Sequence, residues 1–166
     1  MPAWKQMEDY LKSIMPEPDE EETQRRWFNA REGVLWCAVR AATHSISYRP
    51  FPVGCAAWGF KPNAHPAERW DVYNGANVKA FAEMPKVCAE ITSLMGAIQD
   101  GYSRIIGMVI VGNPREEDLD DVLYPCENCR LTMRKVPIIR TDTHVILARP
   151  KQSDMPSHID DPREDL

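Results

Sequence analysis

Apolar side chains in the first third of the chain recur every three or four residues, which is the spacing of one face of an α-helix. A short helix is therefore expected over residues 4–14, and Pro16 would end it. A second, longer helix is expected to start at Thr23, whose hydroxyl can cap the first turn, and to run to about Thr43. The apolar positions of this helix include Trp27, Val34, Ala38 and Ala41.

The remainder of the chain alternates between strand-like and helix-like segments. Apolar runs bounded by turn residues predict strands over residues 53–59, 70–78, 104–112, 136–140 and 144–148. Helices are predicted over residues 88–100 and from about 125 to 135. Strands that alternate with helices indicate an α/β domain.

Composition divides the chain into three regions. The 166 residues suffice for one domain with a sizeable core and are too few for two. Residues 1–22 are expected to form an N-terminal extension, residues 23–149 the α/β domain, and residues 150–166 a flexible acidic tail. Inside the domain, residues 113–124 are expected to form an acidic loop.

The charge balance argues against a polyanionic partner. The chain carries 20 Lys and Arg against 25 Asp and Glu, which gives a formal net charge of −5. Its basic residues form no cluster larger than Arg25-Arg26 and Arg134-Lys135, whereas nucleic-acid binders normally carry a basic stripe. We therefore expect a small-molecule substrate and no nucleic acid. The longest apolar run, residues 105–111, is too short to span a bilayer, and the N-terminus lacks a secretory signal, so we expect no membrane partner and a cytoplasmic location.

The five cysteines fall into two groups. Cys37 and Cys55 lie inside apolar segments, where core packing is the ordinary explanation. Cys126 and Cys129 follow a proline at the expected start of a helix and, three residues apart, lie on one helix face. Cys88 occupies the same place at the start of the other helix. Because the positive end of a helix favours thiolates, a shared metal site is predicted if the two helix starts meet.

The predicted metal is zinc, since three protein ligands with a fourth position open are typical of catalytic zinc sites. Glu90 stands two residues after Cys88, where its carboxylate could move protons between a zinc-bound water and a substrate. Arg130 directly follows Cys129, and its guanidinium could donate to a cysteine sulfur and offset the negative charge of the thiolates. Taken alone, Cys-x-x-Cys also fits a redox dithiol or a closed structural zinc site, and Glu90 also fits a favourable first-turn position.

Four segments, in this order along the chain, resemble the cytidine deaminase family in its branch of small free-nucleoside enzymes. They are residues 48–57 (YRPFPVGCAA), 74–78 (NGANV), 88–90 (CAE) and 125–130 (PCENCR). The resemblance implies a three-layer α/β/α fold with a mixed central sheet of about five strands, and a homotetramer. It also implies that zinc is held by Cys88, Cys126 and Cys129, with Glu90 as the proton shuttle.

The resemblance assigns substrate contacts as well. Phe51 would pack against the pyrimidine ring and Asn77 would hydrogen-bond the sugar, while the backbone of Ala89 and the carbonyl near Tyr124 would face the base. From the residues alone, Phe51 is equally compatible with core packing and Asn77 with a turn position.

One position departs from the family pattern. Cytidine deaminases carry a Glu two residues after the Asn that corresponds to Asn77, and this Glu accepts hydrogen bonds from ribose hydroxyls. In this chain the position is Lys79, whose ammonium group has no acceptor. The run from Asn77 to Phe81 is more similar to blasticidin S deaminases, which also lack the Glu. Lys79 could pair with a carboxylate or phosphate of the substrate, or it could be a solvated loop lysine.

The sequence thus predicts zinc-dependent hydrolytic deamination of a free cytosine nucleoside or analogue, of the cytidine, deoxycytidine or blasticidin S type. Deamination of cytosine in nucleic acids or nucleotides is the alternative, and a non-catalytic structural zinc module is a second one.

Overall fold

The computed structural model describes residues 2, 5–6, 9–10, 18–115 and 122–149. Most of the helix expected over residues 4–14 lies outside these residues, as do the expected tail and residues 116–121 of the expected acidic loop. Within the described part of the chain, every helix is too short or too polar to cross a membrane.

The first long helix begins earlier than the sequence predicts. Helix α2 (Glu20–Ala42) is capped by Asp19, whose side chain accepts a hydrogen bond of 2.8 Å from Glu22 N. The prediction that Thr23 caps this helix is wrong, because Thr23 is buried in the first turn and its hydroxyl donates to the Asp19 carbonyl at 2.6 Å. The first turn contains Glu20, Glu21 and Glu22, which were expected to lie in the N-terminal extension. The helix dipole favours negative charge at this end of the helix.

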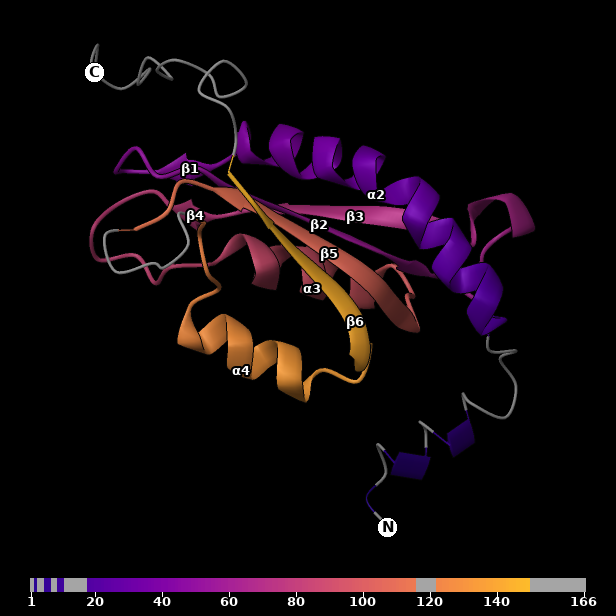
Figure 1. Cartoon of the computed structure of the whole chain (residues 1–166). Helices are drawn as coiled ribbons and strands as arrows, with labels where there is room; N and C mark the ends of the chain where they lie inside the picture. The colour runs from indigo at the N-terminus through magenta and orange to yellow at the C-terminus, as the bar shows by residue number, and fades with distance from the viewer. Residues whose placement is uncertain (1, 3–4, 7–8, 11–17, 116–121, 150–166) are drawn as a thin grey trace.

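Four strands form a central mixed sheet in the order β3-β2-β5-β6. Their bounds are β2 (Val53–Phe60), β3 (Trp70–Ala76), β5 (Arg104–Gly112) and β6 (Ile139–Ala148). Strand β2 runs antiparallel to β3 and β5, whereas β5 and β6 are parallel. Helix α2 covers one face of this sheet, and α3 (Ala89–Gln99) and α4 (Glu127–Lys135) lie on the other (Figure 1). The expected three-layer α/β/α fold is confirmed.

Two details of the strands differ from the prediction. The strand expected over residues 70–78 ends at Ala76, and residues beyond it form β4 (Val78–Lys79), which pairs in parallel with β1 (Ile46–Ser47). The central sheet therefore has four strands, with a separate pair beside it, where about five were expected.

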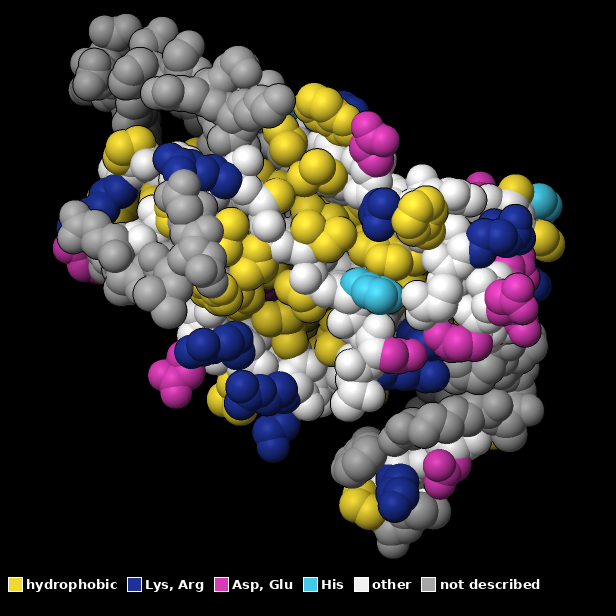
Figure 2. Space-filling model, in the orientation of Figure 1, with side chains coloured by type: hydrophobic (Ala, Val, Ile, Leu, Met, Phe, Trp, Pro, Cys, Tyr) yellow, Lys and Arg dark blue, Asp and Glu magenta, His cyan; other side chains and the backbone are white. Residues whose placement is uncertain are grey.

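The two strands expected over residues 136–140 and 144–148 are one strand, β6. Polar residues interrupt the apolar pattern there, but Thr143 keeps the backbone paired. Its hydroxyl accepts from Arg140 N at 3.0 Å and donates to the Ile105 carbonyl at 2.8 Å, where the register with β5 shifts. β6 is also an edge of the sheet, and Figure 2 shows hydrophobic side chains gathered on this side between α2 and α4.

The core lies on both faces of β2, in which every residue is buried. Because successive strand residues point to opposite faces, Ala56 and Trp58 pack with Trp27 of α2. Cys55 and Ala57 point the other way and pack in the cluster formed with α3. The core role predicted for Cys55 is confirmed, and Cys37, half-buried on α2, packs against the first of these clusters.

Gly54 allows α2 to lie directly on β2, and its replacement tests that packing. A Cβ at Gly54 would overlap the Ala38 carbonyl oxygen and come within 2.6 Å of Ala42 N, and both atoms are backbone. We expect Gly54→Ala to lower the free energy of unfolding by about 3 kcal/mol, because the helix must move away from the strand. Gly33→Ala on the same helix is the control, since a Cβ there meets nothing within 4 Å and should stabilise the helix by about 1 kcal/mol. Equal urea midpoints for the two variants would contradict this account of the packing.

Candidate active site

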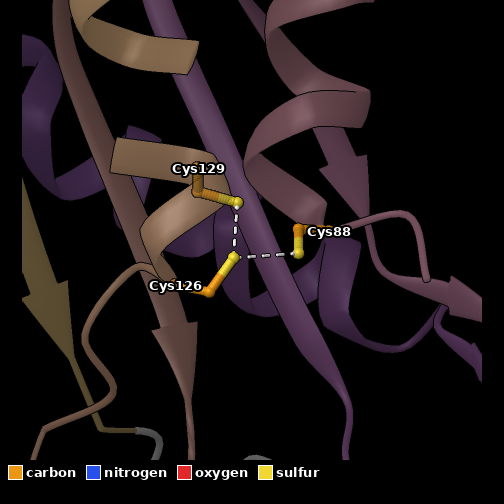
Figure 3. A group of neighbouring side chains, drawn as sticks. All are labelled: Cys88, Cys126 and Cys129. Atoms are coloured by element: carbon orange, nitrogen blue, oxygen red, sulfur yellow. Dashed lines mark hydrogen bonds between the residues drawn. The ribbon is translucent and has the colours of Figure 1, made fainter. Parts of the chain in front are cut away.

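Three cysteine thiols meet where the starts of α3 and α4 come together (Figure 3). The Sγ atom of Cys88 lies 3.6 Å from that of Cys126, which in turn lies 3.4 Å from the Sγ of Cys129. All three sulfur atoms lie within 4.8 Å of one another. The convergence that the sequence predicted for these residues is present in the structure.

Helix starts explain how two distant segments present their thiols together. Cys88 and Cys126 are the N-cap residues of α3 and α4, with extended backbone angles of φ −75°, ψ 152° and φ −65°, ψ 165°. Neither side chain makes a capping hydrogen bond to the backbone of its helix, so both sulfur atoms can point to the shared cluster. Cys129 follows in the first turn of α4 and is fully buried.

This set of donors fits a zinc ion. Sulfur atoms held tetrahedrally around zinc at about 2.3 Å lie about 3.8 Å apart, close to the separations between these thiols. Among the described residues, the cluster of potential metal ligands holds these three cysteines alone, so a fourth coordination position would be left to a small molecule.

The thiols differ in how readily they ionise. Hydrogen bonding with Cys129 lowers the pKa of Cys88 to about 6, and the positive charge of Lys86 adds to this effect against the opposing influence of burial. The same interaction with Cys88, together with burial, raises the pKa of Cys129. The two thiols ionise as a coupled pair, in which formation of one thiolate, the form that a metal requires, is favoured over formation of the second.

Glu90 lies beside the cysteines in the first turn of α3 and is only 4% exposed. Burial raises its pKa, while hydrogen bonding with Cys129 and the positive charges of Lys86 and Arg115 act in the opposite sense. A buried carboxyl group with a raised pKa holds a proton more readily than an exposed one, and such groups are common among the residues that transfer protons in active sites.

One pocket contains this group of side chains. It is lined by Phe51, Val53, Asn77, Lys86, Cys88, Ala89, Glu90, Arg115, Leu123, Tyr124 and Cys126. Four of the residues that the resemblance assigned to substrate are therefore brought to the same cavity as the cysteines and Glu90: Phe51, Asn77, Ala89 and Tyr124.

Asn77 is also a structural link. Its Oδ1 accepts hydrogen bonds from Ser45 Oγ at 2.6 Å and from Val53 N at 2.8 Å, and its Nδ2 donates to the Phe51 carbonyl at 2.9 Å. Through these bonds Asn77 links the residue before β1 and the first residue of β2 to the segment that carries Phe51. Of the amide group's hydrogen-bonding capacity, one N–H remains for a ligand.

The other assigned residues lie differently. The Tyr124 carbonyl accepts a hydrogen bond of 2.9 Å from Arg115 Nη2. Lys79 is not among the pocket-lining residues, and its Nζ lies 5.6 Å from the centre of the Tyr48 ring. Arg130 is exposed, and within the described part of the chain its side chain makes no hydrogen bond to a cysteine sulfur.

Sequence reasoning missed two positive side chains of the pocket, Lys86 and Arg115. Lys86 stands two residues before Cys88, so its proximity to the helix start was a usable signal. Arg115 lies three residues after the end of β5 and lines the pocket, and no spacing in the sequence indicates this position.

The fold and the site define a class: an α/β/α domain that presents three converging thiols and a buried carboxyl group at the starts of two helices.

No family model matches the chain. Solved cytidine deaminases have a similar fold. That of Burkholderia pseudomallei is 22% identical, with a TM-score of 0.56 over 73% of this chain and 86% of its own. That of Mycobacterium leprae is 22% identical, with a TM-score of 0.52 over 69% and 85%. That of Mycobacterium tuberculosis is 20% identical, with a TM-score of 0.51 over 74% and 85%. The chain thus has the fold of the cytidine deaminases.

Proposed function

We propose that this protein is a zinc-dependent hydrolase that deaminates a free cytosine nucleoside or nucleoside analogue, of the cytidine, deoxycytidine or blasticidin S type. The observation that carries the proposal is the convergence of Cys88, Cys126 and Cys129 beside the buried carboxyl group of Glu90, at one pocket. The likeness of the fold to cytidine deaminases supports the same reaction.

In this proposal the three cysteines would hold zinc, and Glu90 would move the protons. Bound zinc would supply a water acidic enough to lose a proton near neutral pH. Glu90 would accept that proton, give it to N3 of the cytosine ring, and then carry the second proton of the water to the amine at C4. The water oxygen would form a bond to C4 of the cytosine ring. The C4–N bond would then break and ammonia leave, so that cytosine and water become uracil and ammonia.

Other pocket residues would position the base. Phe51 packs against the buried core and lines the pocket, so its ring can lie against a pyrimidine. Ala89 is fully buried at the start of α3, where its backbone would face the base. Asn77 would offer its remaining N–H to the sugar.

The proposal is tested with zinc-loaded protein and a panel of cytidine, deoxycytidine, cytidine monophosphate, blasticidin S and a short single-stranded DNA that contains cytosine. We expect ammonia release and the ultraviolet change from cytosine to uracil with at least one of the free nucleosides, and none with DNA. Stoichiometric zinc without release of ammonia from any compound would instead indicate a structural zinc module. Activity on DNA alone would indicate the nucleic-acid alternative.

We also propose that copies of the chain associate, in line with the homotetramer that the resemblance implies. Val145 lies on β6, an edge strand of the sheet, and an edge strand presents backbone groups that a second chain can pair with. Light scattering on the purified protein measures the assembly directly.

A further inference from the structure

The pocket beside the cysteines is short of free hydrogen-bond acceptors on the side that would hold the sugar. The Asn77 Oδ1 atom is occupied by Ser45 and Val53, and the Phe51 carbonyl accepts from the Asn77 Nδ2. The Tyr124 carbonyl accepts from Arg115. Among the described residues that line the pocket, Glu90 is the one acidic side chain, and the proposed reaction uses it for proton transfer.

Positive groups, by contrast, line the same pocket. Lys86 and Arg115 are both lining residues, and both act electrostatically on Glu90. Lys86 forms no ion pair with any other residue that the structure describes, and its side chain is exposed at the pocket. Arg115 is held toward the pocket wall by its bond to the Tyr124 carbonyl. A lysine ammonium group has donors only, so its natural partner is an anion or another strong acceptor.

We propose that the pocket selects a cytosine nucleoside whose sugar part carries an anionic group, a carboxylate or a phosphate, and that Lys86 binds this group. The inference rests on the proposed deamination and names its substrate class. A carboxylate keeps the substrate a nucleoside analogue, whereas a phosphate makes it a nucleotide, which is the alternative that the sequence left open. It moves the anion-binding role considered for Lys79 to Lys86, because Lys86 lines the pocket and Lys79 does not. An unmodified ribose would offer Lys86 no anionic group to bind.

Lys86 also has an effect on the candidate metal site. Its positive charge favours the ionised forms of Cys88 and Glu90. The experiment therefore has to separate binding of an anionic substituent from zinc binding and from turnover.

The test measures equilibrium binding of three product-like nucleosides to zinc-saturated protein by calorimetry: uridine, uridine 5′-monophosphate and uridine 5′-carboxylate. Because these compounds need no turnover, the result does not depend on the deaminase assay. We expect at least one of the anionic compounds to bind about tenfold more tightly than uridine at low salt, as one charge-assisted hydrogen bond provides. The preference should shrink as salt is added, and the two anionic compounds show whether carboxylate or phosphate fits.

Variants then assign the preference to a residue. Lys86→Gln should reduce it to within about twofold, because the neutral amide keeps no charge–charge attraction, and Lys86→Arg should retain it. Lys135→Gln, an exposed lysine at the end of α4, is the matched control and should behave as wild type. If Lys86→Gln does not fold, Lys86→Ala takes its place as the neutral variant.

Two results would overturn the inference. These are equal or weaker binding of both anionic compounds relative to uridine, and a preference that survives in Lys86→Gln. In the second case, loss of the preference in Lys79→Gln would assign the anion to Lys79. A Lys86→Gln protein that loses zinc affinity while keeping the anion preference would assign the lysine to the metal site instead. Failure of the proposed function itself is distinguishable, because it would leave every cytosine compound intact whatever the binding result.

Discussion

Glu90→Gln is expected to lower the rate of deamination by about 10²- to 10⁴-fold, the contribution typical of a positioned general acid–base group, without loss of zinc. Glutamine has nearly the same size and shape as glutamate but cannot exchange a proton at this pH. Glu90 is not one of the three clustered ligands, and its buried position in α3 accommodates an isosteric neutral group. The measurement pairs the steady-state rate on the best substrate with zinc content by atomic absorption.

Glu127→Gln provides the matched control for this experiment. Glu127 occupies the first turn of α4, as Glu90 does in α3, but it is exposed and is not a pocket-lining residue. We expect its activity to stay within about twofold of wild type, since surface substitutions rarely disturb the fold. A Glu90→Gln protein that deaminates normally would refute proton transfer by this carboxyl group. A variant that loses zinc together with activity would show that Glu90 supports the metal site instead.

The three clustered cysteines could be predicted as a candidate metal site from the sequence because their signals are local. The geometry of a first helical turn accounts for all three signals. They are the proline before Cys126, the spacing from Cys126 to Cys129, and the position of Cys88 at another helix start. What the residues alone left open was whether the two helix starts meet. The sheet decides this, because α3 and α4 lie on the same face of it.

The substrate side of the site was less predictable because its contacts are distant along the chain. The side-chain partners of Asn77 lie 24, 26 and 32 positions away, at Val53, Phe51 and Ser45. No periodicity marks such a link, and the residue therefore looked like a turn position or a sugar ligand. The two-residue strands β1 and β4 could not be predicted either, because they are too short to produce an alternating pattern.

The capping error at Thr23 has a different origin. Asp19 and Thr23 are both good N-cap residues, and Asp19 begins an acidic run, residues 19–22, that was expected to belong to the N-terminal extension. The structure places the negative charges of Glu20, Glu21 and Glu22 in the first turn, where the helix dipole stabilises them. Composition suggested an extension where local electrostatics instead favours a helix.

Loss of the metal is expected to have a larger effect than loss of the Glu90 carboxyl group, and Cys129→Ser tests it. Cys129 is fully buried and lies 3.4 Å from Cys126 at the Sγ atoms, so its removal leaves two ligands and should abolish stoichiometric zinc binding together with deamination. A ligand that binds only the folded state stabilises it, so zinc at a free concentration 100 times its dissociation constant should stabilise the wild type by about 2.7 kcal/mol. That is about 5–10 °C in the unfolding midpoint of a domain of this size.

Calorimetric or fluorescence melting with zinc and with a chelator separates metal loss from simple damage to the core. In the wild type the midpoint should fall on chelation, whereas Cys129→Ser should melt at one temperature in both conditions, near the chelated wild type. Cys37→Ser is the control, because Cys37 is a half-buried thiol on α2, outside the cluster, and should keep both the zinc-dependent shift and the activity. A Cys129→Ser protein that retains the shift and the rate would show that these three sulfur atoms do not form the metal site, and the proposed reaction would lose its physical basis.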